Sequence, residues 1–169
     1  MTTVTLSDLG GYEPPDVQAA HEQWGATCGP CAFAAVNGIT LAQARRCFPL
    51  VTLRRTWVNP TQMRHALDLL GQPYTVHGAA SRPAEPQLVL IQFGGPWLLP
   101  SVPPAVAYRY THWVAFRPSD RAVWDANLGW WTTEREWKAE IADDLMRNIK
   151  RCDGTLSVKL RLAIIRSDP

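Results

Sequence analysis

Two cysteines three residues apart are the first residues in this chain whose types and spacing could do chemistry. They stand in the stretch QWGATCGPCAF as Cys28 and Cys31. Such a pair is either a redox couple or the source of a single nucleophile, because a thiolate at a helix N-terminus is stabilised by unpaired N–H groups and the helix dipole. Small and apolar residues continue to Asn37 and stop at Gly38, which predicts a buried helix starting at the cysteines.

The residues around the pair favour the nucleophile. CGPC is the redox motif of thioredoxins, but that fold needs a buried strand leading into the motif, and the preceding PDVQAAHEQWGAT contains no apolar run. A zinc site would need a second pair of ligands, whereas Cys47 and Cys152 each stand alone. We therefore expect no metal and no organic cofactor.

A cysteine hydrolase also needs a histidine that takes the thiol proton, a residue that orients this histidine, and a donor for the oxyanion. His112 opens the apolar run HWVAF, and Asp125 follows in WDAN. Gln23 lies five residues before Cys28, where a side-chain amide could serve the oxyanion. All the parts of such a site are present in the sequence.

In this order, Q-x4-C-G-P, HWV and the following D resemble the papain-like cysteine peptidases, a superfamily that includes the bacteriocin-leader (double-glycine) processing peptidases. The resemblance covers residues 23–127 in three short motifs. It implies that Gln23 is the oxyanion donor, that Cys28 is the nucleophile, that His112 is the general base and acid, and that Asp125 orients the histidine.

Two of these positions keep an alternative. Papain itself has C-G-x-C with the second cysteine catalytic, which would make Cys31 the nucleophile, although the spacing from the glutamine then no longer fits. Papain also orients its histidine with an asparagine, a part that Asn127 could take in place of Asp125.

The elements that position these residues divide the chain in two. In the first half, Thr40 caps a predicted helix that runs to about Phe48, and Asn59-Pro60 opens a helix that ends at Gly71. In the second half, short apolar runs predict strands at residues 74–76, 88–93, 112–116 and 122–125, the last two joined as a hairpin. A capping box at Thr133 predicts a helix over about 134–149, and alternation over 156–165 predicts a last strand.

This order predicts an α+β fold of the papain-like kind, in which a helical part that carries the nucleophile packs on a mostly antiparallel sheet that carries the histidine and the aspartate. We expect one domain over residues 1–169, with an N-terminal extension at 1–20, the helical part at 23–71 and the sheet part at 74–169.

Composition gives no sign of a nucleic-acid or membrane partner. The net charge of +2 comes from 17 basic and 15 acidic residues that are scattered along the chain, so no basic face indicates nucleic acid or an anionic membrane, and we expect neither as a partner. The sequence shows no signal peptide and no transmembrane segment, and its four cysteines do not form a disulfide framework. We expect a cytoplasmic protein, or one of bacterial or phage origin carried on a larger assembly such as a virion.

The function expected from these residues is that of a cysteine peptidase that cleaves an amide bond through a thioester on Cys28. Its substrate would be a peptide, a protein or a peptidoglycan peptide. Three alternatives stay open: a peptidoglycan-cleaving or protein-deamidating amidase carried on a phage tail or toxin-delivery assembly, a non-catalytic binding or assembly module, and a CGPC thiol redox protein.

Overall fold

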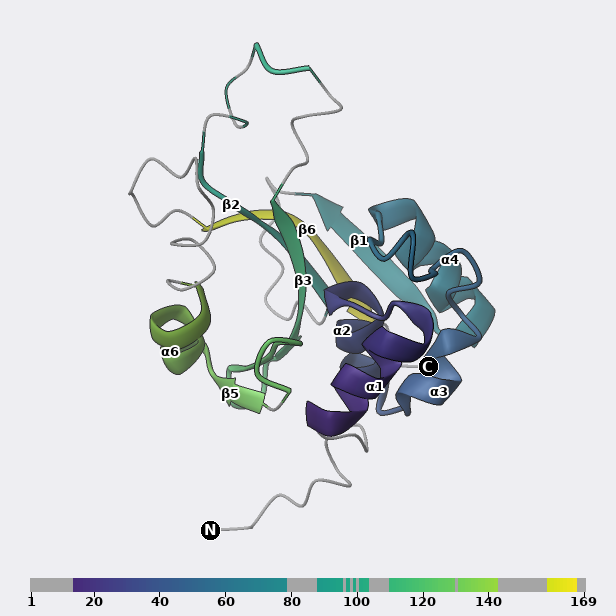
Figure 1. The fold of residues 1–169 in the computed structure, drawn as a ribbon. Helices are drawn as coiled ribbons and strands as arrows, with labels where there is room; N and C mark the ends of the chain where they lie inside the picture. The colour runs from purple at the N-terminus through teal and green to yellow at the C-terminus, as the bar shows by residue number, and fades with distance from the viewer. Residues whose placement is uncertain are drawn as a thin grey trace, which may run out of the picture.

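The computed structural model of the chain describes residues 14–78, 88–95, 97, 99, 101–103, 110–129, 131–142 and 158–166. Helices fill the first half and strands dominate the second, so the predicted α+β class is confirmed (Figure 1). The helices are α1 (Pro14–Trp24), α2 (Cys28–Asn37), α3 (Leu41–Arg45), α4 (Pro60–Leu70) and α6 (Glu134–Trp137), which runs on into the π-helical turn η3 (Lys138–Ala142).

Six strands form one sheet, and every neighbouring pair in it is antiparallel. The strands are β1 (Tyr74–Gly78), β2 (Leu88–Phe93), β3 (Thr111–Arg117), β4 (Ala122–Trp124), β5 (Trp131–Thr133) and β6 (Val158–Arg166). Their order across the sheet is β1-β6-β2-β3-β4-β5, so the last described strand lies between the first two. The predicted hairpin is confirmed, because β3 and β4 pair with Ala115 opposite Trp124.

The helix ends follow local sequence signals. Helix α2 ends at Gly38, whose φ of 62° is the left-handed conformation that glycine adopts readily. Helix α4 begins after a capping box between Asn59 and Gln62, as predicted. Helix α3 is shorter than predicted, since the chain closes tighter three-residue turns from Ala44 onward and brings Phe48 into the core.

Two elements were not predicted. Helix α1 occupies part of the expected N-terminal extension, so the helical part begins at residue 14 and not at residue 23. Its sequence has no apolar run, and among its residues of described burial, 16–24, the helix places only Ala20 and Trp24 fully in the core. Strand β5 has no counterpart among the predicted strands, yet it pairs with β4 through Thr132 opposite Val123. The rest of the predicted extension, residues 1–13, lies outside the described chain.

The predicted helix over 134–149 is confirmed only at its start. The capping box between Thr133 and Glu136 is present, and α-helical geometry lasts to Trp137 before the π-helical turn. The remainder of the prediction, residues 143–149, falls outside the described residues, as do the first two residues of the last predicted strand.

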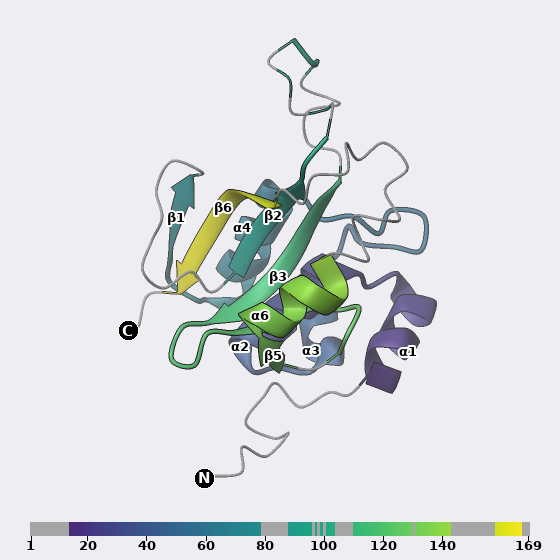
Figure 2. The ribbon, with the colours of Figure 1, turned by 90° about the vertical axis from the view of Figure 1, so that its left-hand side faces the viewer.

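Helices α1 to α4 pack on one face of the sheet, and α6 lies on the other (Figures 1 and 2). Alternate residues of β2 and β3 face opposite sides. Leu88, Leu90 and Trp113 join the larger core under the helices, whereas Val89, Ile91 and Val114 join a smaller cluster with Trp137 of α6. Trp113 and Trp124 are both buried.

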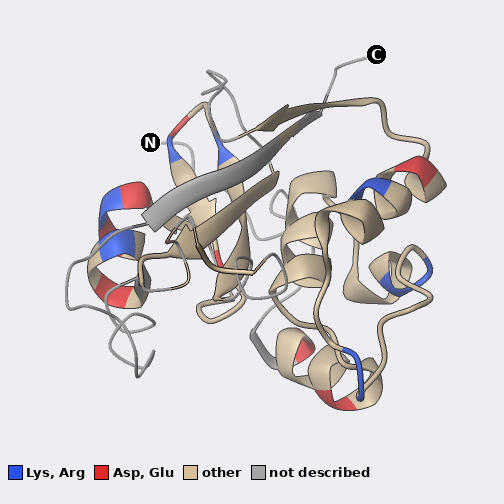
Figure 3. Ribbon diagram, turned by 90° about the horizontal axis from the view of Figure 1, so that it is seen from above, with Lys and Arg blue, Asp and Glu red and all other residues tan. Residues whose placement is uncertain are grey.

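Charged residues are mixed over the described elements, with Lys and Arg interspersed among Asp and Glu (Figure 3). Within the described part of the chain, no helix has the length and apolar character that crossing a bilayer requires.

Candidate active site

Cys28 is the first residue of α2, at an N-terminus that no side chain caps. The N-cap residue is Thr27, but its hydroxyl donates instead to the backbone carbonyl of Thr56, at 2.7 Å. The backbone N–H groups of Cys28 and Gly29 therefore have no hydrogen-bond partner among the described residues. Unpaired donors at a helix N-terminus stabilise negative charge, which favours a thiolate or an oxyanion at this point.

His112, in the second position of β3, links the thiol to a carboxylate. Its Nε2 lies 2.8 Å from Oδ2 of Asp125, which follows directly after β4. Because Nε2 is used in this way, Nδ1 is the ring nitrogen left for the hydrogen bond between His112 and Cys28. The structure thus brings the three predicted residues into one line, from α2, β3 and the end of β4.

Asp125 is completely buried and held by four N–H donors. Its Oδ2 accepts from His112 and, at 2.8 Å, from the indole Nε1 of Trp137. Its Oδ1 accepts from the backbone and the side-chain amide of Asn127, at 2.9 and 2.8 Å. Burial raises the pKa of Asp125, but the charge of His112 and these hydrogen bonds outweigh burial and lower the pKa, so the carboxylate stays charged.

Opposite pKa shifts on Cys28 and His112 favour an ion pair. Burial raises the pKa of Cys28, yet the charge and hydrogen bond of His112, together with the backbone N–H of Trp113, lower it overall. Burial lowers the pKa of His112, but the charges of Asp125 and Cys28 raise it well above its usual range. A low thiol pKa beside a high imidazole pKa is the condition for a thiolate–imidazolium pair at neutral pH.

The alternatives for the nucleophile and for the orienting residue occupy different places. Cys31 lies one turn further into α2 and is fully buried, and burial followed by the charge of Cys28 raises its pKa strongly. Of the two thiols, Cys28 is the one that contacts His112. Asn127 donates to Asp125 and so supports the carboxylate, which is itself the partner of the histidine.

No hydrogen bond or ion pair joins Gln23 to Cys28, His112 or Asp125 in the described residues, so its part as oxyanion donor stays a prediction. Because α1 continues to Trp24, Gln23 lies on a helical face with Asp16 and Ala20, exposed, and lines a hollow between α1 and α3 that Arg45 also lines. The backbone N–H groups of Cys28 and Gly29 lie at the start of α2 with the nucleophile, and the backbone N–H of Trp113 contacts the thiol.

Trp137 is the site residue that sequence reasoning missed. Its indole reaches Asp125 from the face of the sheet opposite α2, and the ring is 4% exposed. The only signal in the sequence was the capping box that predicts α6. The box fixes where this helix begins but does not indicate which side chain turns toward the sheet.

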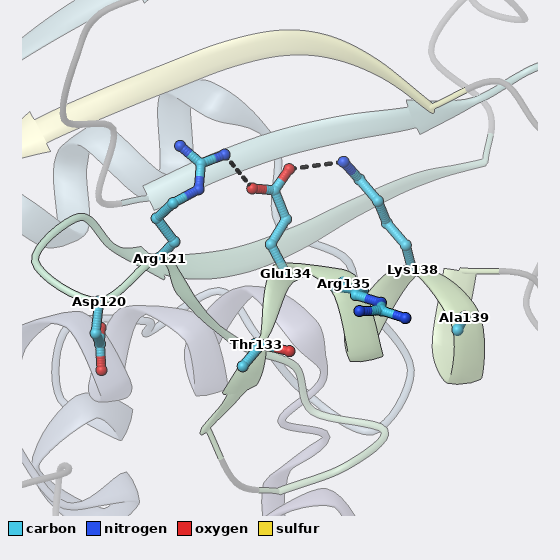
Figure 4. A pocket seen from close by; sticks show the side chains of 7 residues that line it. All are labelled: Asp120, Arg121, Thr133, Glu134, Arg135, Lys138 and Ala139. Carbon is cyan, nitrogen blue, oxygen red and sulfur yellow. Dashed lines mark hydrogen bonds and ion pairs between the residues drawn. The ribbon is translucent and has the colours of Figure 1, made fainter.

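A second hollow lies beside α6 and is lined mostly by charged side chains (Figure 4). Glu134 forms ion pairs with Arg121 and Lys138 across it, and neither Cys28 nor His112 lines it. In the described residues no three His, Cys, Asp or Glu side chains gather as metal ligands would.

Comparison of the chain with family models, with curated proteins and with solved structures gave no match. What can be said about the chemistry therefore depends on the geometry of Cys28, His112 and Asp125.

Proposed function

We propose that this protein is a papain-like cysteine peptidase that hydrolyses an amide bond through a thioester on Cys28. The observation that carries the proposal is the line of contacts from Cys28 through His112 to a buried, charged Asp125. A thiol, an imidazole and a carboxylate in this order are the parts of a nucleophile, its base and the group that orients the base.

In the first half of the reaction, the Cys28 thiolate attacks the carbonyl carbon of the scissile amide. The negative charge that develops on the carbonyl oxygen is stabilised by the unpaired N–H groups of Cys28 and Gly29. His112 holds the thiol proton on Nδ1, delivers it to the leaving amine, and the C–N bond breaks to give a thioester.

In the second half, neutral His112 takes a proton from water, and the hydroxide attacks the thioester carbonyl. The C–S bond breaks, the acid product leaves, and the proton returns to the Cys28–His112 pair. Asp125 keeps its charge throughout and holds the ring through Nε2, so that Nδ1 faces the sulfur in both halves.

The first test is alkylation by limiting iodoacetamide near pH 6, with peptide mapping of every cysteine. At this pH an ordinary thiol with a pKa of about 8.5 is less than roughly 1% thiolate, so rapid labelling requires an activated thiol. We expect rapid labelling confined to Cys28 and a loss of roughly tenfold or more in His112→Ala. Equal and slow labelling of all cysteines would contradict the proposal.

Matched cysteine variants separate hydrolysis from thiol redox chemistry. Reduced, carboxymethylated casein is the substrate, and mass spectrometry distinguishes new termini from the gain of about 1 Da that deamidation causes. Cys28→Ala should abolish the reaction, and Cys31→Ala should keep it, because only Cys28 contacts His112. Loss of the reaction in both variants would contradict a single nucleophile and favour the cysteine pair.

A further inference from the structure

The segment between α3 and α4, residues 49–58, exposes large apolar side chains, and its last residues contact the neighbours of the nucleophile. Leu50, Leu53 and Trp57 are 56%, 61% and 57% exposed, and they make up three of the seven large hydrophobic residues exposed in the described part of the chain. Exposed apolar surface of this kind commonly marks a binding site.

Contacts on both sides of Cys28 fix this segment to the site. Before the cysteine, Thr27 donates its hydroxyl to the carbonyl of Thr56 at 2.7 Å. After it, Gly29 packs so closely on Val58 that an added Cβ would lie 2.8 Å from the valine Cβ. Trp113, the residue after His112, donates its indole N–H to the carbonyl of Val58 at 2.9 Å. Trp57 therefore stands between two residues that contact the neighbours of the nucleophile.

The segment is also closed on itself, which keeps its side chains in place. Thr52 and Arg55 exchange two backbone hydrogen bonds, of 3.1 and 2.8 Å. Beyond this turn the guanidinium of Arg55 lies over the Trp57 ring, 5.1 Å from its centre. Preorganised side chains of this kind lose little freedom when a ligand binds.

The exposed arginines of this segment favour a partner that carries a negative charge. Arg54 and Arg55 are exposed, and neither forms an ion pair with an acidic residue in the described ranges. An arginine that stacks on an aromatic ring keeps N–H groups free for a carboxylate. The surface therefore offers an apolar contact and an unpaired positive charge side by side.

Resting on the function proposed above, we propose that Trp57 and Arg55 form the wall that binds the acyl side of a peptide substrate and selects an apolar residue two positions away from an acidic one. The acyl side is assigned because the leaving amine must lie against His112, on the sheet, to receive its proton. The two substrate residues are separated by one residue, because successive side chains of an extended chain point to opposite faces and only alternate residues, about 6.6 Å apart, can contact the same wall.

The test uses acetylated tetrapeptidyl chloromethyl ketones that end in alanine, have glycine in the second position and alkylate Cys28 from the acyl side. The first and third residues are Leu and Glu in either order, Leu and Lys in either order, Gly and Glu in either order, or two glycines. We expect the better Leu–Glu probe to inactivate the protein about tenfold faster than its Gly–Glu counterpart. Its rate of inactivation should exceed that of its Leu–Lys counterpart by roughly threefold at low salt and by a smaller factor at high salt.

Variants assign the two preferences to the two residues. Trp57→Ala should remove the preference for leucine, and Arg55→Gln should remove the preference for glutamate over lysine while leaving that for leucine. Leu69→Ala and Arg64→Gln, exposed residues of α4, are the matched controls and should keep both. Each preference is a ratio of two rates within one variant, so a change in the reactivity of Cys28 cancels.

The same samples treated with iodoacetamide separate this inference from the proposed function. Rapid labelling of Cys28 by iodoacetamide, together with equal rates for all the peptide probes, would contradict the proposed binding role of Trp57 and Arg55. It would still agree with Cys28 as the nucleophile. Preferences that survive both Trp57→Ala and Arg55→Gln would also overturn it. Slow labelling of Cys28 by iodoacetamide would overturn the proposed function and, with it, the inference that rests on it.

Discussion

Asp125 is the residue on which the site depends most, because a buried carboxylate is tolerated only when its charge is compensated. Four N–H groups do so, and they come from β3, from the turn after β4 and from α6. Hydrogen bonds to a charged group contribute about 1.5 to 3 kcal/mol each, and a buried acceptor that loses its donor is costly. The same hydrogen bonds therefore orient His112 and stabilise the fold.

Replacing Trp137 by phenylalanine removes one of these donors while keeping a buried ring. We expect Trp137→Phe to lower the free energy of unfolding at neutral pH by roughly 1 to 3 kcal/mol. The lowered pKa of Asp125 contributes stability above the unfolded pKa, and this stability is lost as the pH falls through the folded pKa. Without the indole N–H the folded pKa rises, so acid unfolding should begin at a higher pH.

Urea unfolding of wild type and variant at pH 7 and near pH 3 measures this effect. The difference between the two proteins should shrink at the lower pH, where the carboxylate is protonated in both. The control is Trp24→Phe, because the Trp24 indole lies in the helical core and donates to no carboxylate in the described residues. This variant should lower the free energy of unfolding by the same amount at both pH values. A pH-independent cost for Trp137→Phe would mean that its indole acts only by filling space.

At this scale the sequence predicted the residues that have a chemical signature. Cys28, His112 and Asp125 were found because cysteine, histidine and aspartate beside apolar runs are recognisable in sequence. Trp137 was missed, because a tryptophan that donates to a carboxylate has the same pattern as one that fills the core. The part of Gln23 stays a prediction, because its spacing from Cys28 does not say which face of α1 the glutamine occupies.

Helix α2 carries the nucleophile in its first turn. This turn packs closely against segment 49–58. Gly29 is required there for space, because an added Cβ would lie 2.8 Å from Val58 and 3.4 Å from Trp113. The elements with local start and stop signals, α2 and α4, were predicted with correct ends. Strand β5 carries no such signal, since three residues gain strand geometry only by pairing with β4.

Gly29→Ala tests this close packing. The alanine should destabilise the protein by roughly 1 to 3 kcal/mol through overpacking, and it should slow alkylation of Cys28 near pH 6 by moving the first turn of α2 away from His112. Gly38→Ala is the control at the other end of the same helix, where a Cβ meets nothing within 4 Å but φ is 62°. It should cost about 1 kcal/mol in backbone strain and leave the alkylation rate unchanged. A Gly29→Ala protein that matches wild type in both measurements would contradict the packing argument.

For the whole molecule, the decisive feature is that the site is divided between two layers. The thiol belongs to the helices, whereas the imidazole and the carboxylate belong to the sheet and the turn that follows it. The sequence predicted both layers, because hydrophobic periodicity is local. It did not predict the strand order, which depends on contacts between distant segments such as β2 and β6.

We expect activation of Cys28 to be lost in the same urea transition as the folded structure. Rapid alkylation at pH 6, tryptophan fluorescence and exposure of the buried Cys47 thiol should then give one common midpoint. Cys47 reports on the helices, and the activation of Cys28 reports on their contact with the sheet. Loss of rapid alkylation at a lower urea concentration than exposure of Cys47 would show that the layers separate before either unfolds.

The place of β6 has a consequence for how the chain is made. This strand is the last that the structure describes, yet it covers the edge of β2 that does not pair with β3. All six residues of β2, LVLIQF, are buried in the finished sheet. During synthesis β2 has an open apolar edge until residues 158–166 leave the ribosome, and an open edge of this kind pairs readily with other chains. The protein therefore passes through its period of greatest risk of aggregation before its sheet can close.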